Sequence, residues 1–335
     1  MDLQAFLTEW HNDSPTVLVH TSGSTGEPKP MWVEKRRMEA SARTTCDFLG
    51  LHSSDTALLC MPLDYIAGKM MVVRSLVRGL RLIAVEPSGN PLAAVRETVD
   101  FAAMVPMQVW NTLQVPEQRE RLANIRHLII GGGAIDDSLA AELQTFPNTV
   151  WSTYGMTETL SHIALRRLSG PDASDWYTPF DGVQLSLTTE GCLAINAPAL
   201  HDGLLTTNDI AELSSDGRFK ILGRKDNIIC SGGLKIQAEE VERRLLPHLR
   251  APYIISKRKD KKFGEVVVLL TEGNTATAQT ICQSVLPKFW QPRAYIHVDS
   301  IPLTATGKPA RKEAEKYIFK HLAISKKTYN FAHEE

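Results

Sequence analysis

Residues 21–29 read Thr21-Ser22-Gly23-Ser24-Thr25-Gly26-Glu27-Pro28-Lys29, between an apolar run at 17–20 and a charged, helix-compatible segment at 33–49. Glycines let backbone N–H groups approach phosphate oxygens closely, hydroxyls donate further hydrogen bonds, and a lysine supplies countercharge. A Ser/Gly linker is the alternative interpretation. The position between a strand-like run and a helix-like segment favours a loop that binds a polyphosphate.

Strand and helix signals alternate along the chain after this loop. We expect strands at 56–60, 81–85, 101–105, 127–130 and 149–152, and helices at 68–77, 92–99, 107–113 and 138–144. Alternation at this spacing predicts a mostly parallel sheet covered by helices. Ligands of such sheets bind at the carboxyl ends of strands, so the loops after residues 19, 60, 130 and 152 should converge on one site.

The sequence pattern changes near residue 179, where short strands are separated by Gly and Asp turns. These strands, at 183–187, 192–195, 210–213 and 219–222, predict a small antiparallel β subdomain. Residues 1–223 would thus form a large N-terminal α/β domain. Residues 224–335 would form a small α+β domain, with a hairpin at 231–233, helices at 238–246 and 277–286, and strands at 253–255, 265–271 and 295–298. The basic cluster at 257–262 is read as a solvated turn or as a contact for the phosphates of a large ligand.

Length and composition exclude several classes of protein. A chain of 335 residues with 43% hydrophobic and 22% charged residues is typical of a globular protein of two domains. A net charge of −1 argues against a nucleic-acid partner. The chain has neither an apolar run of membrane-spanning length nor a signal-peptide layout at its start. Its five cysteines have no zinc spacing, which predicts buried, reduced thiols and a cytoplasmic location.

The loop at 21–29 differs from the common nucleotide-binding patterns. A P-loop has four residues between its glycines, whereas only Ser24 and Thr25 separate Gly23 from Gly26, and the Gly-x-Gly-x-x-Gly fingerprint is absent. The order Thr-Ser-Gly-Ser-Thr-Gly-x-Pro-Lys instead resembles the phosphate loop of the adenylate-forming superfamily of acyl-CoA synthetases, adenylation domains and luciferases. The resemblance implies that the ATP phosphates are bound by Thr21, Ser22, Gly23, Ser24, Thr25, Gly26 and Lys29.

A second motif, residues 152–159, reads Ser-Thr-Tyr-Gly-Met-Thr-Glu-Thr and directly follows an expected strand. A tyrosine offers a flat face to a base, a threonine can contact a phosphate, and Mg²⁺ prefers carboxylate and phosphate oxygens. The alternative is a plain turn with an acidic residue at a helix start. The motif resembles the second core motif of the superfamily, which implies that Tyr154 flanks adenine, Thr157 contacts the α-phosphate and Glu158 binds Mg²⁺.

Two further segments resemble parts of the nucleotide site. Gly132, Gly133 and Ala134 end a strand, and in the family such a segment forms a wall of the adenine slot, since a backbone without side chains lets a base lie close; a tight turn is the alternative. Asp209 and Arg224 correspond to residues that contact the ribose. Asn208 stands where the family usually has glycine, and asparagine tolerates a left-handed backbone.

Three positions of the C-terminal part carry expectations from the resemblance. Asp226 matches the hinge about which this domain rotates between half-reactions, although Arg224 and Asp226 could instead form a surface ion pair of little energetic value. Gly232 and Gly233 match the glycines that line the pantetheine tunnel of CoA ligases, or serve a turn. Lys308, in Thr-Gly-Lys-Pro, matches the lysine that bridges carboxylate and α-phosphate, a charge suited to a transition state.

The acyl pocket is expected near residues 62–69 and after Glu158. The segment Pro-Leu-Asp-Tyr-Ile-Ala-Gly-Lys resembles the family segment that approaches the acyl group, which implicates Tyr65, Lys69, Ser161 and His162. A second carboxylate on the substrate would need a cation such as Lys69 or Arg74. In the alternative interpretation, His162 is a hydrogen-bonded core residue, and Lys69 and Arg74 lie on a solvated helix face.

Together the motifs predict an ATP-dependent carboxylate–CoA ligase that forms an acyl-adenylate and then a thioester, with ATP, Mg²⁺ and coenzyme A. Residues 157–164 resemble the o-succinylbenzoate–CoA ligases of menaquinone biosynthesis, which implies that acid as substrate. Only twenty residues precede the phosphate loop, so we expect a short form that lacks most of the usual first subdomain and has a mobile C-terminal domain. A homodimer is plausible. The alternatives are an enzyme that loads a carrier-protein phosphopantetheine and a non-catalytic nucleotide-binding protein.

Overall fold

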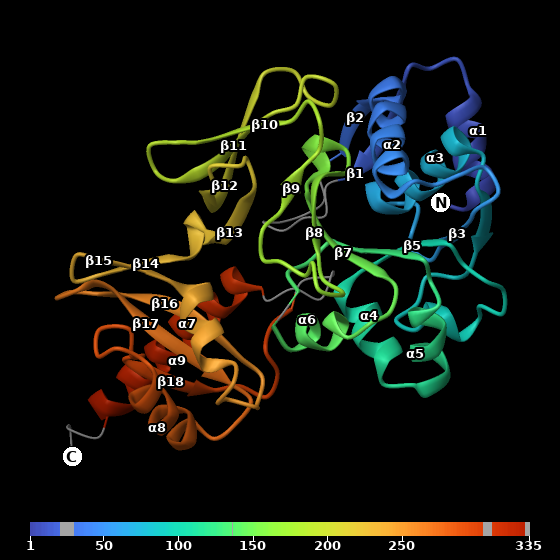
Figure 1. Ribbon diagram of the computed structural model, residues 1–335. Coiled ribbons are helices and arrows are strands. Elements are labelled where there is room, and N and C mark those ends of the chain that lie inside the picture. The colour runs from blue at the N-terminus through green and yellow to red at the C-terminus, as the bar shows by residue number, and fades with distance from the viewer. Residues whose placement is uncertain (21–29, 136, 304–309, 332–335) are drawn as a thin grey trace. The chain divides into compact units, whose positions relative to one another are not determined.

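The computed structural model describes residues 1–20, 30–135, 137–303 and 310–331 (Figure 1). Contacts divide the chain into two compact units. The first comprises residues 1–188, 194–207 and 213–220, and the second comprises 189–193, 208–212 and 221–335. The domain boundary at residue 224 and the hinge at Asp226 remain predictions.

The first unit contains a seven-stranded sheet in the order β4-β3-β5-β6-β7-β8-β9. Its strands are β3 (Thr56–Leu59), β4 (Arg81–Ala84), β5 (Phe101–Met104), β6 (His127–Ile130), β7 (Thr149–Gly155), β8 (His162–Arg167) and β9 (Thr178–Pro179). Strands β4 to β7 pair in parallel, whereas β8 and β9 are antiparallel. The predicted mostly parallel sheet is therefore confirmed.

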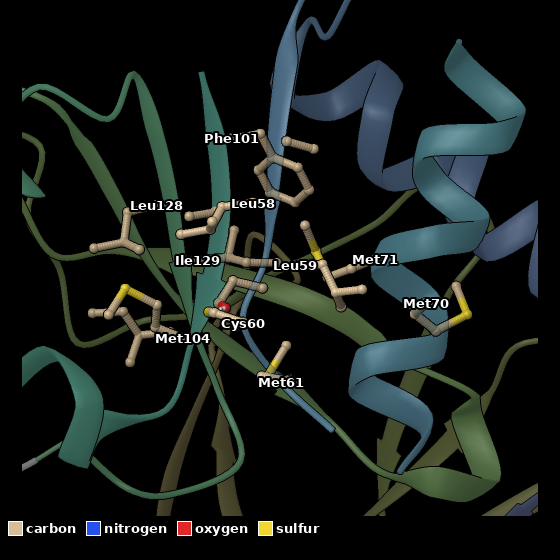
Figure 2. Close-up of a cluster of buried hydrophobic side chains, with 14 of the residues drawn as sticks. Leu58, Leu59, Cys60, Met61, Met70, Met71, Phe101, Met104, Leu128 and Ile129 are labelled. Carbon is tan, nitrogen blue, oxygen red and sulfur yellow. Dashed lines mark hydrogen bonds between the residues drawn. The ribbon is translucent and has the colours of Figure 1, made fainter. Parts of the chain in front are cut away.

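Helices accompany these strands in the expected alternation. They are α1 (Leu3–His11), α2 (Lys35–Leu49), α3 (Ile66–Arg78), α4 (Pro106–Leu113), α5 (Pro116–Ala123) and α6 (Asp137–Gln144). Helices α2 and α3 are capped by the following residues Gly50 and Gly79, whose positive φ values of 61° and 71° suit the left-handed C-terminal turn. Figure 2 shows the core that results, with Met71 of α3 beside Leu59 of β3 and near Phe101 of β5. All three side chains are buried.

Two predicted helices need correction. The helix expected from residue 33 begins at Lys35, because residues before it form β2 (Pro30–Glu34), which pairs antiparallel with β1 (Thr16–His20). The helix expected at 92–99 is only the short 3₁₀ turn η1 (Pro91–Ala93). Side chains take the carbonyls that a helix would use: Arg96 donates to Ala93 O at 2.6 Å, and Arg121 donates to Leu92 O at 2.8 Å.

Short strands follow in a four-stranded sheet ordered β10-β11-β12-β13. These are β10 (Gln184–Leu187), β11 (Cys192–Asn196), β12 (Leu204–Leu213) and β13 (Phe219–Arg224). Their order along the chain matches their order in the sheet, as expected for strands joined by tight turns. The predicted fold class, with its small β subdomain, is confirmed.

The described residues of the second unit form a five-stranded sheet together with helices. Its elements are β14 (Ile228–Ser231), β15 (Leu234–Gln237), α7 (Ala238–Leu245), β16 (Tyr253–Asp260), β17 (Gly264–Thr271), α8 (Thr275–Val285), β18 (Ala294–His297) and α9 (Arg311–Phe331). The predicted hairpin is β14–β15. The basic cluster is not purely a turn, because residues 257–260 continue β16, and Lys257 Nζ donates to Ile228 O at 2.9 Å.

Two smaller expectations can be compared with this structure. None of the five cysteines forms a disulfide, although Cys230 is exposed rather than buried. Among the described residues, no helix combines the length and the apolar composition needed to cross a membrane.

Candidate active site

Several predicted nucleotide-binding residues are brought together at the ends of β6 and β7. Gly131 follows β6, and a Cβ at this position would lie 2.3 Å from Thr153 Oγ1 of β7, so a larger residue would require the Thr153 side chain to move. The chain then turns at Gly132, where φ is +77°, and leaves Gly132 and Ala134 exposed. The predicted adenine wall and Tyr154 therefore belong to neighbouring strand ends, as the parallel sheet requires.

The Tyr154 ring is held by two aromatic residues that the sequence reasoning did not identify. It meets Phe219 edge-on at 5.1 Å between centroids and Tyr177 at 5.9 Å, while Tyr177 and Phe219 stack on each other at 5.3 Å. The Tyr177 hydroxyl is 2.9 Å from Ser152 Oγ. Such packing restricts the Tyr154 ring to one orientation, which a platform beside a base requires. No local motif marks Tyr177 or Phe219, because their contact is tertiary.

The predicted phosphate and metal ligands lie on the 3₁₀ turn η2 (Thr157–Thr159). Thr157 is buried and Glu158 is exposed. Met156 N donates to Thr159 Oγ1 at 3.0 Å, which closes the turn, and Leu160 adopts the unusual φ of +65° where the chain reverses into β8. The motif is thus a specifically constrained turn between two strands, with its carboxylate directed outward.

The fit of Glu158 to Mg²⁺ can be judged from its contacts. Within the described part of the chain, Glu158 takes part in no ion pair, so its oxygens are available to a cation. No cluster of three or more His, Cys, Asp or Glu side chains suited to a metal exists among the same residues. One free carboxylate fits Mg²⁺, which proteins commonly hold through one or two carboxylates together with substrate phosphates.

The predicted ribose residues and the predicted hinge residue lie together in the second unit. Arg224 Nη1 donates to Asp209 Oδ1 at 3.1 Å, and Arg224 Nη2 lies 3.5 Å from Asp226 Oδ2. Asn208 Nδ2 donates to the same Asp226 oxygen at 3.3 Å. Asparagine at position 208 therefore joins the cluster, whereas glycine there could not. Whether this cluster contacts ribose remains a prediction.

The predicted CoA-tunnel glycines form the turn between β14 and β15. Gly232 and Gly233 have φ values of +57° and +86°, a region that favours glycine, and Gly232 N donates to Phe263 O at 2.8 Å. The turn alone is sufficient to explain both glycines. Their role in a tunnel remains a prediction.

The two cations of the expected acyl pocket are not on a solvated helix face. Lys69 and Arg74 of α3 are each 2% exposed, so that alternative is wrong. Lys69 Nζ donates to Leu18 O at 2.6 Å and pairs with Glu9 at 3.5 Å. Because its charge is already shared with groups of this chain, Lys69 is the weaker candidate for a substrate carboxylate. Half-buried Tyr65 directly precedes the same helix, and its backbone forms an isolated parallel β-bridge with His20, the last residue of β1.

Arg74, the other of these two cations, has no carboxylate partner among the described residues. No acidic side chain among the described residues forms an ion pair with it, and its Nε is buried without a hydrogen bond. Nη2 donates to Ser161 Oγ at 2.5 Å, and Nη1 reaches only Met71 Sδ at 3.8 Å. Burial lowers the pKa of Arg74 to about 10, so the guanidinium is still charged at neutral pH. An unpaired buried charge is costly, and such a group is a candidate for ligand binding.

His162 lies in the same buried cluster as Arg74. Its Nδ1 is 3.2 Å from Ser161 Oγ, and its Nε2 is 3.1 Å from Thr45 Oγ1. Burial, and secondarily the charge of Arg74, hold the pKa of His162 well below its usual range. The imidazole is therefore neutral, as expected for the hydrogen-bonded core residue of the alternative interpretation.

The predicted catalytic lysine and the phosphate loop lie outside the described residues. This concerns Lys308 and Thr21, Ser22, Gly23, Ser24, Thr25, Gly26 and Lys29. Their neighbours are described: β1 leads into the loop, and α9 begins three residues after Lys308. Their roles remain predictions.

The fold and the nucleotide-site motifs define an adenylate-forming enzyme, and comparison with known proteins agrees. The model of the family "AMP-binding enzyme" matches residues 4–188, more than half of the sequence. The chain belongs to this family, which confirms the predicted superfamily.

Similar proteins refine this classification. A 2-succinylbenzoate–CoA ligase of Lactococcus lactis is 25% identical over 91% of this chain and 72% of its own length. The crystal structure of an acyl-CoA synthetase (AMP-forming)/AMP-acid ligase II-like protein from Dyadobacter fermentans is 31% identical, covers 92% of this chain and 91% of that one, and has a TM-score of 0.64. An o-succinylbenzoate CoA synthetase from Bacillus subtilis, in complex with the acyl-adenylate intermediate, shares the fold at 24% identity and a TM-score of 0.75, with 89% and 68% of the two chains covered.

Proposed function

We propose that this chain is an AMP-forming carboxylate–CoA ligase whose acid substrate is o-succinylbenzoate. Membership of the AMP-binding family and similarity to named CoA ligases support the reaction class. In the first half-reaction a carboxylate oxygen bonds to the α-phosphorus of ATP, and the bond from that phosphorus to the bridging oxygen breaks, releasing pyrophosphate. In the second, the CoA thiol loses its proton, attacks the acyl carbon and displaces AMP.

The protein's part in adenylation is to position reactants and to balance charge. Tyr154, with the backbone at 132–134, would hold the adenine, and Asp209 with Arg224 would hold the ribose. Thr157 would contact the α-phosphate, and the segment 21–29 would bind the other phosphates. Glu158 would hold Mg²⁺, which supplies positive charge to the phosphates when bound. Lys308 would stabilise the charge that develops at the α-phosphate during attack.

The structural observation that carries the choice of acid is the buried, unpaired guanidinium of Arg74. o-Succinylbenzoate bears two carboxylates, so one can be activated while the other pairs with an arginine. The pairing would place an anion beside a charge that has no acidic partner among the described residues. A monocarboxylic acid would leave that charge without a partner, at a large cost in affinity.

The test measures AMP release with MgATP, CoA and three matched acids. They are o-succinylbenzoate, 4-oxo-4-phenylbutanoate, which lacks the ring carboxylate, and 2-butanoylbenzoate, which lacks the side-chain carboxylate. The analogue that lacks the carboxylate to be activated should not react. We expect kcat/KM for o-succinylbenzoate to exceed that for the other analogue by roughly 100-fold, the usual consequence of leaving one member of a buried charged pair alone. The variant Arg74→Gln should lose most of this discrimination.

Other outcomes of the same experiment contradict specific parts of the proposal. Equal use of the three acids would reject the role of Arg74 and the choice of substrate. AMP release only when a phosphopantetheinylated carrier protein replaces CoA would reject the CoA ligase in favour of a carrier-loading enzyme. Binding of ATP without pyrophosphate exchange with any acid would reject catalysis altogether.

A further inference from the structure

Four polar side chains form one hydrogen-bonded row in the core of the first unit. Arg74 comes from α3, His162 is the first residue of β8 with Ser161 directly before it, and Thr45 comes from α2. The row runs from Arg74 Nη2 to Ser161 Oγ at 2.5 Å, from Ser161 Oγ to His162 Nδ1 at 3.2 Å, and from His162 Nε2 to Thr45 Oγ1 at 3.1 Å. Three elements that are distant in sequence therefore share one polar connection.

The direction of every proton in this row follows from its far end. Thr45 Oγ1 donates its single hydrogen to Ser41 O at 3.1 Å, so toward His162 it can only accept. His162 Nε2 must then carry the ring hydrogen, and in a neutral imidazole Nδ1 is left as an acceptor. Ser161 accordingly donates to Nδ1, and its oxygen lone pairs accept from Arg74. Reversing the Ser161–His162 bond alone would move the ring hydrogen to Nδ1 and leave two acceptors, His162 Nε2 and Thr45 Oγ1, facing each other.

Burial favours this one arrangement of hydrogen bonds over the others. Thr45 and Arg74 are 0% and 2% exposed and His162 is 6% exposed, so water cannot readily replace a missing partner. The Phe180 ring packs against the imidazole at 5.4 Å and closes that side. A buried polar group that loses its partner keeps its full desolvation cost. The lowest-energy arrangement therefore has Ser161 Oγ as a fixed acceptor for one edge of the guanidinium.

We propose that Thr45 and His162 are positioning residues for the acid substrate, acting through Ser161 to aim the Arg74 guanidinium at the second carboxylate of the acid. The inference rests on the substrate role proposed for Arg74. The row occupies one N–H of the guanidinium, and the buried Nε–H has no partner within the described part of the chain. The far end of the row, at Thr45, thereby influences how strongly the enzyme prefers a dicarboxylic acid, although Thr45 does not touch the substrate.

The first test observes the tautomer of His162 and is independent of activity. Long-range ¹H–¹⁵N spectra of the full chain report the tautomer of each of its ten histidines, and a His162→Gln variant identifies the resonance of His162. We expect the Nε2–H form at neutral pH in the wild type. Observation of the Nδ1–H form would overturn the row, whatever the substrate proves to be.

The second test uses matched threonine variants. Thr45→Val keeps the shape of the side chain and removes the hydroxyl that accepts from His162, whereas Thr45→Ser retains a hydroxyl. Thr112→Val makes the same change at a buried threonine whose hydroxyl has no partner among the residues that the structure describes. We expect Thr45→Val to raise KM for o-succinylbenzoate about 5- to 10-fold, the effect of one lost buried hydrogen bond. KM for MgATP and kcat should stay within about twofold, and the other two variants should resemble the wild type.

The two proposals fail in distinguishable ways. An equal rise in KM for o-succinylbenzoate and for the single-carboxylate analogue that the wild type uses would show that the effect of Thr45→Val is structural. A rise of the same size in KM for MgATP would show the same. Either result would mean that the positioning role is wrong. If the wild type does not prefer the dicarboxylic acid, the substrate role of Arg74 is wrong, and a confirmed Nε2–H tautomer then supports only the row itself.

Discussion

Arg311 and Glu242 form a two-pronged ion pair that ties the start of α9 to α7. Arg311 Nη1 donates to Glu242 Oε1 at 2.9 Å, and Nη2 donates to Oε2 at 2.6 Å. Glu242 Oε1 also accepts from Ile255 N of β16 at 2.8 Å, and Arg311 donates to Ile255 O. The backbone approaching this pair is held as well, since Ala310 N donates to Pro302 O at 2.8 Å. One carboxylate thus connects three elements of the second unit.

Glu242→Ala should destabilise the protein by about 2–3 kcal/mol, because the largely buried Arg311 would lose its carboxylate. Urea unfolding followed by circular dichroism measures the change. Arg243→Ala on the same helix is the control, because its pair with Glu240 is exposed and should contribute less than about 0.5 kcal/mol. Equal effects of the two variants would show that the Arg311 pair is no stronger than a surface pair.

Lys308→Ala should abolish pyrophosphate exchange, with a loss of about 100-fold or more, because the charge it stabilises develops only during adenylation. Conversion of preformed acyl-adenylate to the CoA thioester should be largely spared. Lys316→Ala removes a similar charge from an exposed pair with Glu313 and should affect neither step. Parallel loss of both half-reactions in Lys308→Ala would contradict the assignment.

His162 should make stability depend on pH below about 6.5. Burial and Arg74 lower its pKa in the folded state, so between that pKa and 6.5 the unfolded chain binds more protons than the folded one. The contribution of His162 to the free energy of unfolding is therefore fully present above pH 6.5. It decreases as the pH falls below that value, by up to about 1.4 kcal/mol per pH unit. In urea titrations between pH 7 and 5, His162→Gln should show a shallower decline than the wild type.

His127 supplies the comparison for this pH effect. Its pKa is also lowered, mainly by burial and then by Arg126, so it contributes with the same sign but is less enclosed. His127→Gln should therefore flatten the decline less than His162→Gln. A wild-type stability that does not change from pH 7 to 5 would refute the buried, neutral state of His162.

Gly68→Ala should disrupt the start of α3. A Cβ at this position would lie 2.3 Å from Pro62 O, so the helix or the preceding turn would have to move, at a cost of about 2 kcal/mol or more. Gly50→Ala provides the comparison, since its Cβ meets no atom within 4 Å and only the left-handed backbone is strained, at about 1 kcal/mol. Thermal unfolding of both variants decides whether steric contact dominates at Gly68.

Much of the parallel sheet could be predicted because its signals are local. Each strand and helix signal is a run of neighbouring residues, and the alternation of the two allows few topologies. The prediction failed at 92–99, where we expected a helix and the structure has only the short turn η1. There the carbonyls of Leu92 and Ala93 are bound by Arg121 and Arg96, and a side chain arriving from 29 residues away leaves no local trace.

The sequence by itself determined the family, the order of the nucleotide motifs and the alternating architecture, since these depend on residue types at short spacing. Only the tertiary structure decided that Lys69 forms an ion pair with Glu9 and that Arg74 is buried without an acidic partner among the described residues. The tertiary structure also decided that Tyr177 and Phe219 pack against Tyr154. It also joined Thr45 to His162 across 117 residues. Burial and hydrogen bonding depend on which distant segments pack together, so the charge and orientation of a side chain become defined only once the chain has folded.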